Sequence, residues 1–242
     1  MFWFLMLFLA DAPSEGVIST NILVECDLLY AQREEREQLM KAIEGYENVL
    51  QKDPAQYEAA WKLSKAFWYA GNHSPAEDKK VYFQKGIAAG QKAANLSPNS
   101  CEGHFWLGIN DAMYAESSGL FKALSLVDEV KKEIGQAMAI DQNCQCGGPQ
   151  RVLGKLYARL PWFKGGSKSK AIDYLKQSLE LCPNDTQSRI FLAEIYVDQN
   201  KKTRAMEQLN LVLQQDPDPA WIPEAKENKI IAAKMLRQLE KP

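Results

Sequence analysis

Two sets of side chains in this sequence have types and spacings that could bind a ligand. The first set is aromatic and comprises Trp61, Trp68, Tyr69 and Phe105. The second set is basic and comprises Arg151, Lys155 and Arg159, which follow at four-residue intervals and so share one face of a helix. Aromatic side chains bury much area at a low entropic cost, and Arg can hold a carboxylate through two hydrogen bonds. Together the two sets indicate a ligand with an apolar part and an acidic part.

Both sets also have a simpler interpretation. An aromatic stripe on a helix often belongs to the core, and a charged stripe is often only a solvated face. The sequence leaves both interpretations open.

Cysteine and histidine supply little further chemistry. The segment Cys144-Gln145-Cys146-Gly147-Gly148 is expected to be a loop between helices. A zinc site needs about four well-spaced ligands, and only His104 is available as a further imidazole. The five cysteines are scattered and odd in number, which is not typical of a disulfide framework. We predict no metal, no other cofactor and an ordinary connecting loop, with a disulfide formed after export as an alternative.

Enzymes and nucleic-acid-binding proteins are disfavoured by what the sequence lacks. It contains no G-x-x-x-x-G-K-[ST], no G-x-S-x-G and no H-E-x-x-H motif. Its carboxylates alternate with Lys and Arg, as on solvated helix faces. With 29 basic and 31 acidic residues the net charge is -2, whereas nucleic-acid-binding domains are usually basic. We therefore predict a protein that is not an enzyme and binds no nucleic acid.

An internal repeat supplies the framework for these candidates. Residues 186–219 match the tetratricopeptide (TPR) pattern, a unit of about 34 residues that folds as two antiparallel helices. The consensus positions are occupied by Leu192, Ala193, Tyr196, Ala205, Leu209 and Pro217. Small residues allow the two helices to approach, and Pro ends the second helix because it cannot continue the hydrogen-bond ladder. Four earlier segments match in phase, namely 147–185, 101–146, 57–100 and 23–56.

Two of these repeats predict unusually long second helices. Ser74-Pro75-Ala76-Glu77 resembles a capping box with Pro at the first helical position, which predicts a helix over 75–96. A second long helix is predicted over 120–140. Such helices would form a wall over a groove or an oligomer contact. A longer loop with a short extra helix is the alternative.

The two ends of the chain differ from the repeats. Residues 1–10 are nearly all apolar and, with Asp11 and Ala12, resemble a secretion signal, although no positive residue precedes them. This predicts export with cleavage after Ala12, against the alternative of a buried N-terminal helix. The run is too short for a membrane span, which takes about 20 residues. A polar helix over 223–239 is predicted to cap the last repeat.

A further pattern runs through the fourth repeat, with Arg151-Val152-Leu153-Gly154, Tyr157, Leu160-Pro161-Trp162, Gly165-Gly166-Ser167 and Ala171. In these residues the chain resembles the TPR-like T-component family of TRAP transporters, over about 23–240. The resemblance implies a bacterial extracytoplasmic accessory protein that works beside a solute-binding protein, in an oligomer with a ligand-passing pore. The orthodox last repeat departs from that family and favours a general binding role.

First helices line the concave face of TPR arrays, so the candidate binding residues follow from counting. They are Trp61, Lys65, Trp68, Tyr69, Phe105, Ile109, Arg151, Lys155 and Arg159.

The sequence as a whole predicts an all-α, right-handed TPR-like solenoid of about five helix pairs. The signal-like segment takes residues 1–20, the array 23–219 and the capping helix 220–242. We expect non-catalytic recognition of a protein or peptide partner, in the periplasm or otherwise exported, or in the cytoplasm if residues 1–10 are not a signal. The alternative is a transport accessory protein holding a small acidic or lipid-like solute. An enclosed pocket would favour the solute and an open groove the peptide. Homo-oligomerisation is left open.

Overall fold

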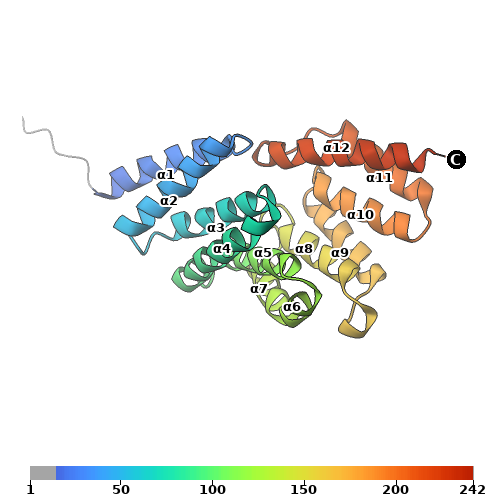
Figure 1. Cartoon of the computed structure of the whole chain (residues 1–242), viewed down its shortest axis with the longest axis horizontal. Coiled ribbons are helices and arrows are strands. Elements are labelled where there is room, and N and C mark those ends of the chain that lie inside the picture. Colours follow the sequence, from blue (N-terminus) through green and yellow to red (C-terminus); the bar gives the residue numbers. More distant parts are fainter. Residues whose placement is uncertain (1–14, 242) are drawn as a thin grey trace, which may run out of the picture.

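The described part of the chain is built from helices that pair in sequence order (Figure 1). The computed structural model describes residues 15–241. The pairs are α1 (Glu15–Ala31) with α2 (Arg36–Lys52), α3 (Tyr57–Asn72) with α4 (Ala76–Leu96), α5 (Cys101–Ser117) with α7 (Val127–Ile140), α8 (Gly148–Arg159) with α9 (Lys168–Leu181), and α10 (Thr186–Asp198) with α11 (Lys202–Gln214). The short helix α6 (Leu120–Ser125) lies between α5 and α7, and α12 (Ile222–Leu239) packs on α11 and α10. The predicted TPR-like solenoid with a C-terminal capping helix is confirmed.

The small and apolar consensus residues lie where the paired helices meet. Ala171, Leu175, Ala205 and Leu209 are fully buried. A Cβ atom on Gly154 would lie 2.6 Å from the Cγ atom of Leu175, which is too close for any larger residue. The repeat pattern therefore marks the contacts that hold each pair together.

The two long helices that the sequence predicts have different outcomes. The first is confirmed, because α4 is continuous over 21 residues. Its predicted capping box is wrong. Pro75 is itself the N-cap, and the buried Ser74 hydroxyl instead donates a hydrogen bond of 2.7 Å to the Ala70 carbonyl, in the helix before it.

The second long helix is wrong, and the alternative of a short extra helix is right. The chain breaks at Leu126 into α6 and α7. A buried face that includes Val130, Ile134 and Ala137 holds α7 against α5. None of the residues of α6 is buried, so no packing keeps α6 in line with α7.

The array curves until its two ends meet. In Figure 1, α12 begins beside the turn that joins α1 to α2. None of the described helices has both the length and the apolarity needed to cross a membrane. Most of the predicted signal-like segment lies outside the described residues, and α1 begins at Glu15, within its last part.

Candidate binding cavity

The concave side of the solenoid contains a cavity of about 730 Å³. Its walls come from α3, α5, α6, α7, α8, the start of α10 and α12. Much of the lining is apolar and includes Trp68, Trp106, Ile109, Leu156 and Trp221. The ring of Trp106 is fully buried, and its centroid lies 5.4 Å from that of Trp68 and 6.4 Å from that of Trp221.

One end of the cavity is closed by contacts between α12 and the N-terminal half. Arg33, in the turn after α1, donates hydrogen bonds of 3.0 and 2.5 Å to the two carboxylate oxygens of Glu224 and one of 2.9 Å to the Ala220 carbonyl. Only 3% of the Arg33 side chain is exposed. Burial opposes its charge, but the neighbouring Tyr30 and the hydrogen-bonded Glu224 outweigh it and raise the Arg33 pKa. We call this cluster the closing contact.

A histidine adds to the closing contact. His73 Nε2 lies 2.6 Å from a carboxylate oxygen of Glu227, and His73 Nδ1 lies 2.8 Å from the carbonyl of Tyr69. Burial opposes the charged imidazole, but these two interactions, with Glu227 the larger, raise the His73 pKa above its ordinary value. His73, Glu224 and Glu227 all line the cavity.

The predicted basic stripe lines the cavity, but the chain supplies its carboxylates. Arg151 contacts Asp185 at 2.9 Å, Lys155 contacts Glu116 at 3.6 Å, and Arg159 contacts Glu194 at 3.4 Å. The stripe thus connects α8 to α10 and α5. The Arg151 pair is the most buried of the three, with side chains 12% and 11% exposed.

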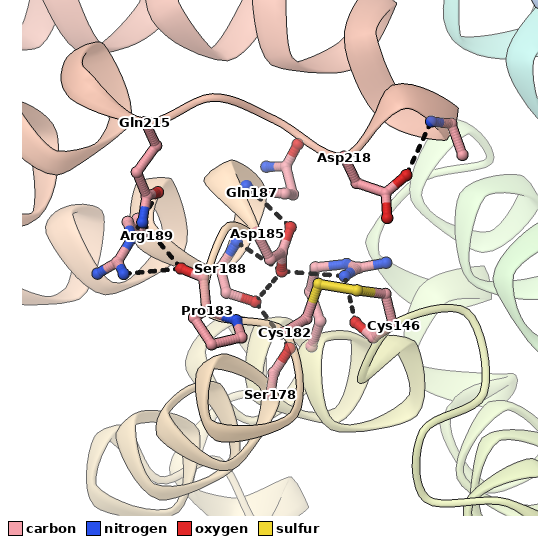
Figure 2. Close-up of a disulfide and its surroundings, with 12 residues drawn as sticks. Cys146, Ser178, Cys182, Pro183, Asp185, Gln187, Ser188, Arg189, Gln215 and Asp218 are labelled. Carbon is pink, nitrogen blue, oxygen red and sulfur yellow. Dashed lines mark hydrogen bonds and ion pairs between the residues drawn. A yellow bond between two sulfur atoms is a disulfide. The ribbon is translucent and has the colours of Figure 1, made fainter.

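Asp185 organises the start of α10 (Figure 2). Its carboxylate accepts hydrogen bonds from the backbone N–H groups of Gln187 and Ser188, as an N-cap does, and from the Ser188 hydroxyl. The same carboxylate holds Arg151, so one residue caps α10 and fixes a side chain at the cavity wall.

Two disulfides lie behind this wall, so the expectation that the scattered cysteines form no disulfide framework is wrong. Cys101 is joined to Cys144, and Cys146 to Cys182. Figure 2 shows the second bridge beside Asp185. The paired residues are separated by 43 and 36 positions, close to the lengths of the repeats at 101–146 and 147–185. Residues one repeat apart face each other in a solenoid, so this spacing was the signal that could have predicted the pairing.

Lys65 lies behind the cavity wall among aromatic rings. Its Nζ atom is 4.9 Å from the Trp221 ring centroid, 5.0 Å from that of Tyr30 and 5.7 Å from that of Trp106. No carboxylate forms an ion pair with it among the described residues. Burial, and then the charge of Arg33, lower its pKa to about 8.

The structure brings together six of the nine predicted binding residues. Those that line the cavity are Trp68, Phe105, Ile109, Arg151, Lys155 and Arg159. Trp61 and Lys65 are not among the lining residues. Tyr69 is a core residue, 2% exposed, because it follows Trp68 and so points about 100° away around the helix. Sequence reasoning missed Trp106, Trp221 and the acidic residues of α12.

The described residues contain no group of three or more His, Cys, Asp or Glu side chains that could hold a metal ion.

Comparisons with protein families divide the chain into two parts. The model of a family described as regulator of microtubule dynamics protein 1-3 matches residues 22–146, which is more than half of the chain. A TPR family model matches residues 168–222. No curated protein matches the sequence. The assignment of the chain as a TPR protein is thereby supported, whereas neither family match is to the TRAP T-components.

Solved structures share the fold at low sequence identity. A thermophilic TPR protein of Thermus thermophilus, TTC0263, is 19% identical with a TM-score of 0.68, over 90% of this chain and 98% of that chain. PilW, a type IV pilus biogenesis factor, is 18% identical with a TM-score of 0.57, over 95% and 94% of the two chains. MamA is 18% identical with a TM-score of 0.51, over 89% and 96%.

Proposed function

The chain belongs to the regulator of microtubule dynamics protein 1-3 family, and we propose that it is a non-catalytic binding module whose ligand enters the concave cavity. One observation carries this proposal. The cavity of about 730 Å³ falls within the range of about 300–1,000 Å³ typical of small-molecule sites, and the closing contact bounds it at one end.

The side chains around the cavity favour a ligand with an apolar body and an acidic group. The apolar lining suits the body. For the acidic group, the lining supplies the cations Arg151, Lys155 and Arg159, each of which is paired with a carboxylate of the chain. The indole N–H of Trp106, a lining residue, is buried and has no hydrogen-bond partner among the described residues. Buried donors without acceptors are costly, and an anionic ligand supplies acceptors. A small acidic or lipid-like solute fits this description.

Native mass spectrometry of the full chain, gently purified from its source cells, tests the proposal. We expect an added mass that dissociates at higher collision energy. Ala112→Trp places a large side chain in the cavity lining and should abolish the added mass. Ala233→Trp, on a half-buried position of α12 outside the lining, is the matched control. A chain without added mass, or an added mass unaffected by Ala112→Trp, would contradict the proposal.

A second candidate is the recognition of a protein partner, which the family description favours. The partner would belong to the machinery that controls microtubules. Cosedimentation of the full chain with taxol-stabilised microtubules is the direct measurement, and binding that survives Ala112→Trp would place this activity outside the cavity. A role beside a solute-binding protein, and assembly into a homo-oligomer, are proposals that rest only on the resemblance to TRAP T-components.

We also propose that the protein is exported into an oxidising compartment. Disulfides persist in such compartments and are rare where glutathione keeps thiols reduced, and four of the five cysteines are paired here. Alkylation of the protein in freshly lysed cells, without reductant, should leave these four cysteines unmodified. Alkylation of all of them would instead place the protein in the cytoplasm.

A further inference from the structure

The far end of the cavity from the closing contact carries four exposed large apolar side chains. They are Leu120, Phe121, Trp162 and Phe163, with 65%, 91%, 85% and 62% of their surface exposed, and we call them the aromatic rim. Leu120 and Phe121 begin α6, whereas Trp162 and Phe163 lie in η1 (Trp162–Lys164), the single 3₁₀ turn between α8 and α9. Exposed apolar residues that occur singly are normal, but four on two short segments mark an interaction surface.

The rim belongs to the mouth of the cavity. Leu120 and Leu124 of α6 line the cavity, and so do Leu160 and Pro161, which directly precede η1. In Figure 1, α6 and the loop between α8 and α9 both extend on the side of the molecule away from α12. The apolar interior is therefore continuous with the exposed rings.

The two segments that carry the rim are themselves basic, although Glu116, Asp128 and Asp173 lie directly beside them in the sequence. Residues 117–127 and 159–172 contain five basic residues and no acidic residue. The basic residues are Lys122, Arg159, Lys164, Lys168 and Lys170. Arg159 is paired with Glu194 and Lys168 with Asp198, while Lys122, Lys164 and Lys170 belong to no ion pair of the described chain.

We propose that the aromatic rim docks on the surface of a lipid bilayer that carries anionic headgroups. Segments that lie in the membrane interface, between the headgroups and the acyl chains, typically combine Trp and Phe with Lys. Clustered lysines are attracted to anionic lipids, whereas Lys is depleted in protein–protein interfaces, and four of the five cations here are lysines. Leu120 belongs both to the rim and to the cavity lining, whereas Phe121, Trp162 and Phe163 do not line the cavity, so substitutions at these three positions leave the lining unchanged.

Vesicle cosedimentation of the full chain tests the proposal. The measured quantity is the ratio of binding to vesicles with about 30 mol% phosphatidylserine over binding to pure phosphatidylcholine vesicles. Because residues 1–14 contain no Lys or Arg, their apolar side chains should bind both kinds of vesicle similarly, and the ratio reports on the basic surfaces of the rest of the chain. We expect a ratio of at least about ten, which falls severalfold when NaCl is raised from about 0.1 to 0.5 M.

Variants assign the binding to the rim. Trp162→Ser combined with Phe163→Ser, and separately Phe121→Ser, should each reduce binding to the anionic vesicles at least tenfold. Lys122→Gln with Lys164→Gln and Lys170→Gln should bring the ratio close to one. Ile230→Ser is the matched control, since Ile230 is 70% exposed on α12, and it should bind like the unmodified chain.

Three outcomes would overturn the proposal. The first is a ratio near one for the unmodified chain. The second is undiminished binding by the rim variants. The third is a stable dimer, measured by light scattering during size-exclusion chromatography, that dissociates in the Trp162→Ser/Phe163→Ser variant, because the rim would then be covered by a second copy of the chain.

Discussion

The two ends of one cavity are built in opposite ways. At the closing contact, Arg33 is buried and its guanidinium donates hydrogen bonds to Glu224 and to the carbonyls of Ala220 and Tyr30. At the mouth, Phe121 and Trp162 are almost entirely exposed, and nothing among the described residues covers them. Stability should therefore depend strongly on the first end and hardly at all on the second. A region that contributes little to folding yet keeps exposed aromatic side chains is better explained by binding than by stability.

The largest expected effect is the loss of the buried ion pair. Arg33→Met leaves Glu224 without its partner in a mostly buried position, and we expect the free energy of unfolding in urea to fall by about 3–5 kcal/mol. Lys226→Met removes an exposed pair with Glu34 in the same region and should cost less than about 1 kcal/mol. Equal effects of the two changes would mean that the closing contact is not rigid.

The next expected effect is an increase in the free energy of unfolding. Because burial lowers the pKa of Lys65 to about 8, the unfolded chain binds this proton more readily than the folded chain does. The destabilisation caused by burying the charged Lys65 is complete below pH 8, and it disappears as the pH rises towards 10.5, the ordinary pKa of lysine. Lys65→Met should therefore raise the free energy of unfolding at pH 7 by about 1–3 kcal/mol and have a smaller effect at pH 10. A loss of stability at pH 7 would show that the charge has a partner.

A smaller effect is expected from His73. Its pKa is raised in the folded state, so its pair with Glu227 contributes stability below the ordinary pKa of about 6.5, and this contribution is lost as the pH rises through the folded value. Both side chains are partly exposed, which limits the effect to less than about 1 kcal/mol. Melting curves of His73→Gln and the unmodified chain should differ at pH 5.5 and converge at pH 9. A constant difference would point to packing instead.

The smallest effect belongs to the mouth. The double change Trp162→Ser/Phe163→Ser should alter the free energy of unfolding by no more than about 0.5 kcal/mol, since both side chains are mostly exposed. Denaturant titration of the vesicle-binding variants is the measurement. A loss of several kcal/mol would mean that these rings pack against the chain and would remove the contrast between the two ends.

The sequence by itself determined the helix pairs. The contacts within each pair join residues close in the chain, and their small and apolar positions repeat with a visible period, as with Gly154 against Leu175. The spacing of the two disulfides also follows the length of the repeats. The odd number of cysteines, which results from the unpaired Cys26, argued against a disulfide framework and hid this relation. Six of the lining residues on α3, α5 and α8 followed from counting along the first helices.

Only the tertiary structure decided how the solenoid ends. Arg33 and Glu224 are 191 residues apart, and their meeting depends on the curvature accumulated over every repeat, which no local pattern encodes. The break at Leu126 likewise depends on α7 having a partner in α5 while α6 has no buried residue. These two features close one end of the cavity and shape the other. The periodic pattern predicts which helices are neighbours. The closure of the cavity depends instead on the sum of many small rotations between successive repeats.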